Sequence, residues 1–213
     1  MPTLSDKLKS LGVKVGAKDL PPPKPRNAFA IENVAPGRVI ATPLGEAFVV
    51  ETAYARDYRH GNAALQIAAS LRTIADWARA ETLAQCEPSA LVFLDTETTG
   101  LAGGTGTYAF LVGIGRFDGD VFRLTQFFMR DPIEEPALLA ALTESLQPRD
   151  ALVTFNGKSF DVPLLNARYI TNGTDTPLKA LPHLDLLPLA RRLWRERLES
   201  RALKSLETHI LGA

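Results

Sequence analysis

The second half of the chain alternates short apolar runs with segments of helical periodicity. The run from Leu91 to Leu94 predicts a buried strand, which we place at residues 90–95. Two runs at 108–116 and 121–129 are joined by Asp118-Gly119-Asp120, a sequence typical of the turn in an antiparallel hairpin. Downstream, the pattern predicts a helix near Pro136, a strand at 151–155, a helix at 159–169, a short strand at 181–185 and a helix at 187–197. This order predicts an α/β fold, a mixed β-sheet with helices on both faces.

The first third of the chain is organised differently. Pro21-Pro22-Pro23-Lys24-Pro25 cannot continue a helix and is typical of a linker. Apolar residues around Pro43-Leu44-Gly45 predict a small hairpin at 38–54, and helical spacing predicts a packed helix at 64–84. We therefore predict three parts: an N-terminal segment and Pro-rich linker at 1–35, a hairpin and helix packing on the main domain at 36–88, and the main domain at 89–213.

Composition is that of a globular domain. With 213 residues, of which 46% are hydrophobic, the chain can bury a substantial core. Lys and Arg number 24 and Asp and Glu number 24, so any contact with nucleic acid must be local rather than driven by net charge. The lone Cys86 excludes an internal disulfide and fits a reducing compartment. Because no window reaches the length of a membrane span and no leader begins at Met1, we expect a cytoplasmic protein without a membrane partner; no oligomeric state is indicated.

Two carboxylates one residue apart follow the first strand of the main domain. Side chains alternate along an extended chain, so Asp95 and Glu97 leave the same face, with Cα atoms about 6–7 Å apart. Like charges at this separation raise each other's pKa unless a cation neutralises them, and hard oxygen ligands suit Mg²⁺ or Mn²⁺. A bare Asp-x-Glu is more often a turn-capping Asp beside a solvated Glu. The buried strand before it and Thr98-Thr99-Gly100 after it favour the metal site.

A second strand end supplies a third carboxylate. The strand at 151–155 leads into Asn156-Gly157-Lys158-Ser159-Phe160-Asp161, in which Ser159 is the expected N-cap of the next helix. Asp161 would then lie in the first helical turn, where the helix dipole favours an anion. Taken alone, Asp161 is more simply explained as a helix-start acid. Ligands of open sheets collect at such strand ends, however, which supports a shared site.

These residues resemble the exonuclease superfamily named for its four catalytic acids, Asp-Glu-Asp-Asp, and within it the YprB-like ribonuclease H-like domain proteins of bacteria. The resemblance runs from about Leu4 to Leu211 and rests on these stretches: Phe93 to Leu101, Gly103 to Tyr108, Gln126 to Asp131, Thr154 to Leu165, His183 to Leu187 and Ala190 to Trp194. It implies a ribonuclease H-like fold and removal of nucleotides from the 3′ end of DNA or RNA. It also implies that Asp95, Glu97 and Asp161 are catalytic metal ligands.

On this basis we expect a site for two Mg²⁺ or Mn²⁺ ions about 3.5–4 Å apart that together hold one phosphate. Asp95 would bridge both ions, and Glu97 and Asp161 would each complete one shell. The expected substrate-binding residues are Thr98, Thr99, Gly100, Asn156 and Lys158.

One family motif is missing by residue 213. The family pattern places a His, followed a few residues later by the fourth Asp, on a helix downstream of the segment seen here as Leu203 to Glu207. Neither His209 nor Asp185 stands in that arrangement, although Asp185 is the first candidate for a replacement ligand. The chain is then either a nuclease that is weak or inactive in this form, or a non-catalytic module that binds nucleic acid or protein. An apolar stripe of Leu203, Leu206 and Ile210 predicts an exposed patch near residue 213.

Several weaker motifs have two interpretations. The segment from Gly103 to Thr107 lacks the Gly-Lys-Ser/Thr of a P-loop, so we interpret it as a flexible loop beside the site. Tyr108 and Phe160 either pack in the core or stack on a base, and His183 is either a buried structural residue or part of the site. A basic run forms either a solvated helix face with internal ion pairs or a strip that follows phosphates: Arg191, Arg192, Arg195, Arg197, Arg201 and Lys204.

Overall fold

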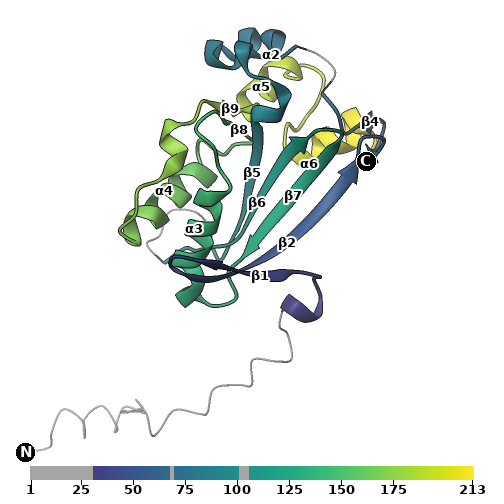
Figure 1. Cartoon of the computed structure of the whole chain (residues 1–213). Helices are drawn as coiled ribbons and strands as arrows, with labels where there is room; N and C mark the ends of the chain where they lie inside the picture. The colour runs from purple at the N-terminus through teal and green to yellow at the C-terminus, as the bar shows by residue number, and fades with distance from the viewer. Residues whose placement is uncertain (1–30, 68–69, 101–105) are drawn as a thin grey trace, which may run out of the picture. The chain divides into compact units, whose positions relative to one another are not determined.

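The computed structural model describes residues 31–67, 70–100 and 106–213, and its compact units divide between Val34 and Ala35. In the second unit, seven strands form one sheet in the order β1-β2-β7-β6-β5-β8-β9 (Figure 1). Their bounds are β1 Arg38–Thr42, β2 Gly45–Ala55, β5 Leu91–Thr98, β6 Ala109–Asp118, β7 Val121–Phe128, β8 Ala151–Thr154 and β9 His183–Asp185. Strand β8 pairs in parallel with β5 and with β9, whereas the other neighbouring pairs of this sheet are antiparallel. The predicted mixed sheet of the ribonuclease H-like class is therefore confirmed.

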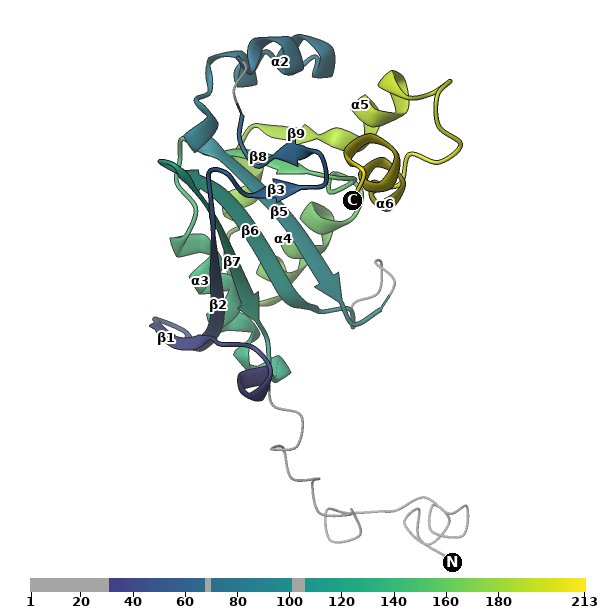
Figure 2. The same ribbon diagram turned by 90° about the vertical axis from the view of Figure 1, so that its right-hand side faces the viewer.

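The remaining elements are short. The helices are α2 Arg72–Ala78, α3 Glu135–Glu144, α4 Asp161–Thr171, α5 Leu186–Leu193 and α6 Leu203–Leu206, and a separate pair of strands is β3 Arg59–His60 and β4 Ala63–Ala64. The 3-10 turns are η3 Ile31–Asn33, η4 Glu81–Gln85, η5 Pro88–Ala90, η6 Pro132–Glu134 and η7 Pro177–Ala180, and a π-helical turn, η8, spans Glu207–Leu211. Figure 2 shows the twist of the sheet, with α2 beyond one end of the strands and α5 and α6 beside it. None of the described helices is both long enough and apolar enough to cross a bilayer.

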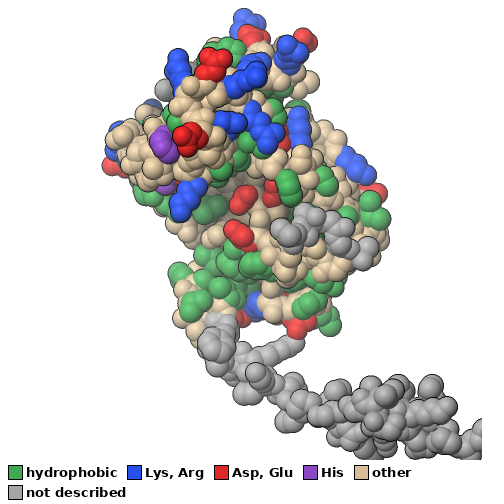
Figure 3. Space-filling model, turned by 180° about the vertical axis from the view of Figure 1, so that it is seen from behind, with side chains coloured by type: hydrophobic (Ala, Val, Ile, Leu, Met, Phe, Trp, Pro, Cys, Tyr) green, Lys and Arg blue, Asp and Glu red, His purple; other side chains and the backbone are tan. Residues whose placement is uncertain are grey.

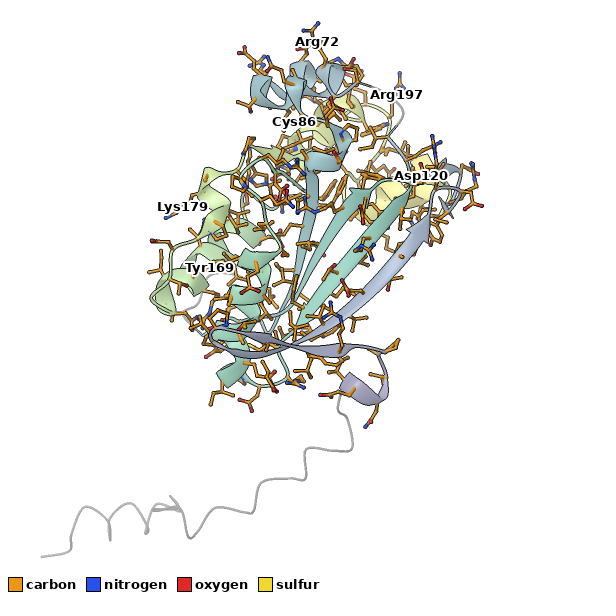
Figure 4. The ribbon with its side chains drawn as sticks, viewed as in Figure 1. Arg72, Cys86, Asp120, Tyr169, Lys179 and Arg197 are labelled. Atoms are coloured by element: carbon orange, nitrogen blue, oxygen red, sulfur yellow. The ribbon has the colours of Figure 1, made fainter. Side chains whose placement is uncertain are left out.

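The larger core lies between the sheet and helices α3 and α4. Val92 and Leu94 of β5 enter it because alternate residues of a strand point to the same face. From the other side come Leu142 and Leu165, both fully buried, and Tyr169. The Tyr169 hydroxyl donates to the Leu139 carbonyl oxygen (3.0 Å), and burial raises the pKa of Tyr169 to about 12 (Figure 4). This core fixes α4, and with it Asp161, against the end of β5.

A smaller core covers part of the opposite face. Leu91 of β5, Val153 of β8 and Leu184 of β9 pack there against α2 and η4. Phe93 points to the same face and meets the rings of Phe117 and Phe122 edge-on, at centroid separations of 5.9 and 5.8 Å. By the same alternation, Asp95 and Glu97 follow Phe93 on this face.

Two buried ion pairs join the elements around the first core. Arg168 of α4 binds Glu135 of α3 through two nitrogen–oxygen contacts of 2.6 Å, and its guanidinium lies 4.2 Å from the centre of the Tyr108 ring. Arg116 of β6 binds the fully buried Asp150 just before β8, with both contacts at 2.8 Å. Removing one partner of such a pair leaves a buried charge and costs about 3–5 kcal/mol. Tyr108, expected either in the core or on a base, is thus held by Arg168.

Three sequence-based element predictions are corrected, and a fourth, the N-terminal hairpin, gains a partner in the sheet. The helix predicted at 64–84 is only α2, because Arg79 adopts a left-handed conformation (φ 55°) that ends it. The hairpin predicted at 38–54 is formed by β1 and β2, and it joins the main domain because β2 pairs with β7 and extends the same sheet. The strand predicted at 90–95 continues to Thr98 because β6 pairs with it throughout. Ser159 is not the N-cap of α4, since Phe160 holds that position and makes no side-chain cap.

The last described residues pack against the β3–β4 hairpin. The Asn62 N–H donates to the Leu211 carbonyl oxygen (2.6 Å), and His60 lies 3.3 Å from the Glu207 carboxylate. Near this contact, Leu203 and Ile210 are 51% and 42% exposed, whereas Leu206, the third residue of the predicted apolar stripe, is half-buried.

Candidate functional site

Two of the three predicted carboxylates lie within β5 rather than after it. Asp95 pairs across the sheet with Gly113 of β6, and Glu97 pairs with Leu111. Both side chains are exposed, on the face that Phe93 also uses. The register slips between Glu97 and Thr98, which ends the regular strand directly after the second acid.

The third carboxylate reaches the same place through the neighbouring strand. Because β8 is parallel to β5, with Phe93 opposite Val153, the chain that leaves β8 emerges beside Asp95. It turns at once and begins α4 with Asp161, which is only 7% exposed. The Thr96 hydroxyl, on the opposite face of β5 from Asp95, donates to Asp161 Oδ1 at 2.6 Å. Thr96 therefore ties the helix-borne acid to the strand that carries the other two.

The acids are close enough to affect one another's ionisation. Partial desolvation raises the pKa of Asp95, although the residue is exposed by its surface area, and the negative charges of Asp161 and Glu97 raise it further. Within the described part of the chain, no Lys, Arg or His forms an ion pair with any of the three. The negative charge gathered at this strand end is thus left uncompensated by the protein.

This donor set has the hard oxygens that Mg²⁺ or Mn²⁺ prefers, and a cation would relieve the repulsion that raises the Asp95 pKa. The side chains are not, however, already gathered around one point. Among residues 31–67, 70–100 and 106–213, no three His, Cys, Asp or Glu side chains converge closely enough to hold one metal ion. Side-chain rotation would be needed to close the site, and the shared binding of one cation by Asp95, Glu97 and Asp161 stays a prediction. Figure 3 shows acidic side chains gathered in a hollow at the centre of one face.

Asp185 has a different role from the replacement ligand considered above. Its Oδ1 accepts hydrogen bonds from the backbone N–H groups of Asn156 (2.7 Å) and Leu187 (3.0 Å), and its Oδ2 accepts one from Lys158 (3.0 Å). The carboxylate caps α5 and holds the turn after β8 in place. With three backbone donors on its two oxygens, Asp185 acts as a structural anchor, and its use as a fourth ligand stays a prediction.

The turn held by Asp185 has a strained and crowded backbone. Asn156 adopts a left-handed conformation (φ 70°), which Asn tolerates better than most residues. At Gly157 a Cβ atom would lie 2.5 Å from the Thr154 side chain, so only glycine fits. Thr154 Oγ1 in turn lies 2.9 Å from His183 Nε2. Burial, and then the charge of Lys158, lower the pKa of His183, which lies half-buried in contact with Thr154 near the site.

The expected substrate-binding residues lie around this turn and the end of β5. The Thr98 hydroxyl donates to the Gly100 carbonyl oxygen (2.7 Å), and the Thr99 hydroxyl accepts from the Tyr108 N–H (3.1 Å). Both hydroxyls are therefore bonded to backbone groups of the protein in this structure. The Gly103 to Thr107 motif falls largely at 101–105, outside the described residues.

Sequence reasoning missed Thr96 and misjudged Asp185. Nothing in the local pattern marks Thr96, since its partner Asp161 is 65 residues away. Asp185 carried a usable signal, because Asp directly before a helical run is a preferred N-cap. Phe160, next to Asp161, is 50% exposed, so core packing does not account for it.

The three acids lie in a part of the chain that matches a known protein family. Residues 92–213 match the family described as the RNase_H superfamily. Over 123 residues the chain is 38% identical to "Uncharacterized protein YprB" of Bacillus subtilis (strain 168); the match covers 57% of this chain and 30% of YprB, so the chain spans about a third of that relative's length.

Two solved structures of Exonuclease I are similar to part of this chain. The apo form has a TM-score of 0.46 at 18% identity, covering 59% of this chain and 38% of Exonuclease I. The E. coli enzyme in complex with a dT13 oligonucleotide has a TM-score of 0.45 at 17% identity, covering 57% and 35%.

Proposed function

The chain belongs to the RNase H superfamily, and from that membership and the acids at the end of β5 we propose that it is a metal-dependent nuclease of the 3′–5′ exonuclease type. The observation that carries the proposal is the gathering of Asp95, Glu97 and Asp161 with no Lys, Arg or His paired to them among the described residues. Partial desolvation, and then the charges of Asp161 and Glu97, raise the pKa of Asp95. A protein keeps like charges together at a functional site when a cation or a substrate group is to be bound there.

Each acid would have a separate task. Asp95, at the centre, would contact both cations, while Glu97 and Asp161 would each complete the coordination of one. Mg²⁺ or Mn²⁺, when bound, supplies the charge that activates a water and stabilises the leaving 3′ oxygen. Thr96 would act as a positioning residue, because its hydroxyl sets the orientation of the Asp161 carboxylate.

The surroundings suit the end of a single strand. Phe160 is an exposed ring beside Asp161, where it could stack on the terminal base. Lys158 is exposed on the turn after β8 and would neutralise a phosphate. The backbone at Thr98, Thr99 and Gly100, and the side chain of Asn156, would hold the terminal nucleotide from the other side.

A nuclease assay tests this proposal. DNA and RNA strands labelled at the 5′ end are incubated with Mn²⁺, and shortening is followed by gel electrophoresis. We expect stepwise loss from the 3′ end, abolished in Asp95→Asn and Asp161→Asn. The control is Asp120→Asn, an exposed acid at the β6–β7 turn that pairs with Arg56 (Figure 4). Equal activity in all three variants would exclude Asp95 and Asp161 as catalytic residues.

A specific observation favours a second candidate, a binding module without catalysis. The described residues contain no ready three-ligand metal group, and Asp185, the first candidate for a fourth ligand, is taken up by backbone donors. This second candidate predicts little or no cleavage by residues 1–213, in contrast to the nuclease. Binding of an oligonucleotide that is unaffected by Mn²⁺, with no cleavage, would favour the module. A reading frame that continues past residue 213 into a His-x-x-x-Asp motif, with cleavage by the longer protein, would favour the enzyme.

We further propose that the protein works in the cytoplasm, since a single cysteine fits a reducing compartment. Within the chain, residues 1–35 would act as a linker, 36–88 as a supporting region, and 89–213 as the nuclease-like domain.

A further inference from the structure

A second, basic pocket lies next to the carboxylate site, between α2, β9 and α5. It has a volume of about 440 Å³, within the range of small-molecule sites. Six of the residues that line it carry the argument: Trp77, Arg79, Lys158, His183, Asp185 and Arg192. Lys158 belongs to the turn that leads to Asp161, and His183 lies within electrostatic range of both Lys158 and Asp161. The pocket therefore adjoins the acids.

The charge of the pocket is positive. Arg79, Lys158 and Arg192 contribute three cations, and none of them pairs with a carboxylate in the described part of the chain. Asp185 is the one acid in the lining, and its oxygens accept three backbone N–H groups. The cations thus remain available to an anion.

The basic run beyond the pocket is also unpaired. Arg191, Arg195 and Arg197 are exposed and form no ion pairs with the described acids. Of the two interpretations of this run, internal ion pairing is not supported by the structure. Figure 3 shows Lys and Arg side chains gathered on the same face as the acidic hollow, toward the α2 end.

An aromatic ring completes the pocket. Trp77 is 46% exposed, although a tryptophan of α2 could have been buried in the adjoining core. Arg192 donates to the Trp77 carbonyl oxygen, which joins α2 to α5 across the pocket. An exposed ring beside several cations is the combination that binds a base by stacking and a phosphate by charge.

We propose that this pocket binds a phosphorylated nucleoside unit, with the base on Trp77 and the phosphate between Arg79, Lys158 and Arg192. As a subsite for a strand whose 3′ end lies at Asp95, it rests on the proposed function. The recognition of a base and a phosphate by this pocket does not rest on that function, because a free nucleotide presents the same two groups. In either case stacking on Trp77 should show little preference among the bases, since every base offers a π-face.

Fluorescence of Trp77 tests the proposal directly. The chain has two tryptophans, so Trp194→Phe leaves Trp77 as the reporter. This protein is titrated in EDTA, which prevents metal-dependent cleavage, with a short single-stranded oligodeoxynucleotide and separately with adenosine monophosphate. We expect stacking to quench the emission. Quenching at lower concentration by the oligonucleotide assigns the pocket to a strand, and equal or stronger quenching by the mononucleotide assigns it to a free nucleotide. Absence of quenching by both overturns the proposal.

Variants of the cations give an independent readout by anisotropy of a labelled oligonucleotide. Arg79→Asn keeps a residue that tolerates the left-handed backbone at this position, and we expect it to weaken binding about fivefold to tenfold and to reduce the salt dependence. The matched control is Arg72→Asn, because Arg72 begins the helix that Arg79 ends but points away from the sheet (Figure 4). Equal affinities for Arg79→Asn and Arg72→Asn would overturn the proposal.

Failure of the two proposals can be told apart. Asp95→Asn should leave Trp77 quenching unchanged while removing any cleavage. Quenching without cleavage in the unmodified chain would count against the nuclease and leave the pocket standing. Cleavage without quenching would support the nuclease and count against the proposed pocket.

Discussion

Asp161 and Asp185 are closely matched in position and opposite in environment. Each comes at or soon after the end of a parallel strand, each stands at the start of a helix, and each is 7% exposed. Asp185 accepts three backbone N–H groups, whereas the Asp161 carboxylate accepts a hydrogen bond from one hydroxyl, that of Thr96. Asp161 also raises the pKa of a neighbouring acid, Asp95. The two carboxylates are therefore equally buried but differ in role, because Asp185 is a structural anchor and Asp161 remains available to a ligand.

The difference follows from which groups surround each acid. Backbone N–H donors satisfy a carboxylate and keep it charged at no further cost. Like charges do the opposite, and the protein gains nothing in stability from keeping them together. This is why the region around Asp161, rather than the region around Asp185, is the one we assign to function.

The largest expected effect is a loss of stability when Asp185, the structural anchor, is replaced. Asp185→Ala leaves three backbone donors without their acceptor and removes the cap of α5, so we expect it to lower the free energy of unfolding by about 3 kcal/mol or more. Urea denaturation followed by circular dichroism measures the loss. Asp161→Ala serves as the matched variant, and we expect it to change stability by less than about 1 kcal/mol because the lost hydrogen bond is offset by relieved repulsion. Equal losses in the two variants would remove the distinction between these aspartates.

A smaller effect is expected from a cation. If the acids of β5 and α4 bind Mn²⁺ in the folded state alone, the metal at tenfold excess over its Kd should stabilise the protein by about 1.4 kcal/mol. Thermal denaturation with and without Mn²⁺ should show a higher Tm for the unmodified chain and no shift for Asp95→Asn. Asp120→Asn should behave like the unmodified protein. A shift of the same size in Asp95→Asn would place the cation elsewhere.

The next effect concerns pH and the turn that Asp185 anchors. Burial lowers the pKa of His183 below its ordinary value of 6.5, so the unfolded chain binds more protons than the folded one as the pH falls below 6.5. The stability from neutral His183 is therefore present above pH 6.5 and lost as the pH falls toward its folded pKa. His183→Gln keeps a hydrogen-bonding group for Thr154 and should flatten this decline in urea titrations between pH 7 and acid conditions. An unchanged decline would show that His183 is not its source.

The smallest effect is expected at Asp95 without metal. Its pKa is raised above the ordinary 3.8 by partial desolvation and by the charges of Asp161 and Glu97, so the charged form is less favourable in the folded state. Asp95→Asn should leave stability unchanged or raise it by less than about 1 kcal/mol at pH 7, since the residue is exposed and screened by solvent. The gain should vanish below pH 3.8, where Asp95 is protonated in both states. A clear loss of stability at pH 7 would mean that Asp95 is a structural residue like Asp185.

The order of the central elements could be predicted because each depends on local pattern. The turn at Asp118-Gly119-Asp120 joins β6 to β7 as expected, with Gly119 at φ 59°. Alternation along β5 was enough to place Asp95 and Glu97 on one face. Helix lengths were less predictable, because α2 ends where Arg79 adopts a left-handed conformation that no residue type nearby required.

The sequence by itself determined the fold class, the strand that carries Asp95 and Glu97, and the position of Asp161 at the start of a helix. These depend on hydrophobic periodicity, turn residues and the two-residue repeat of a strand, all of which act over a few residues. Only the tertiary structure decided that Asp161 binds Thr96, that Asp185 accepts three backbone N–H groups, and that Trp77 and Arg192 meet across a pocket. Those facts depend on pairs of residues distant in sequence, brought together by the parallel pairing of β5, β8 and β9 and by the packing of α2 against α5.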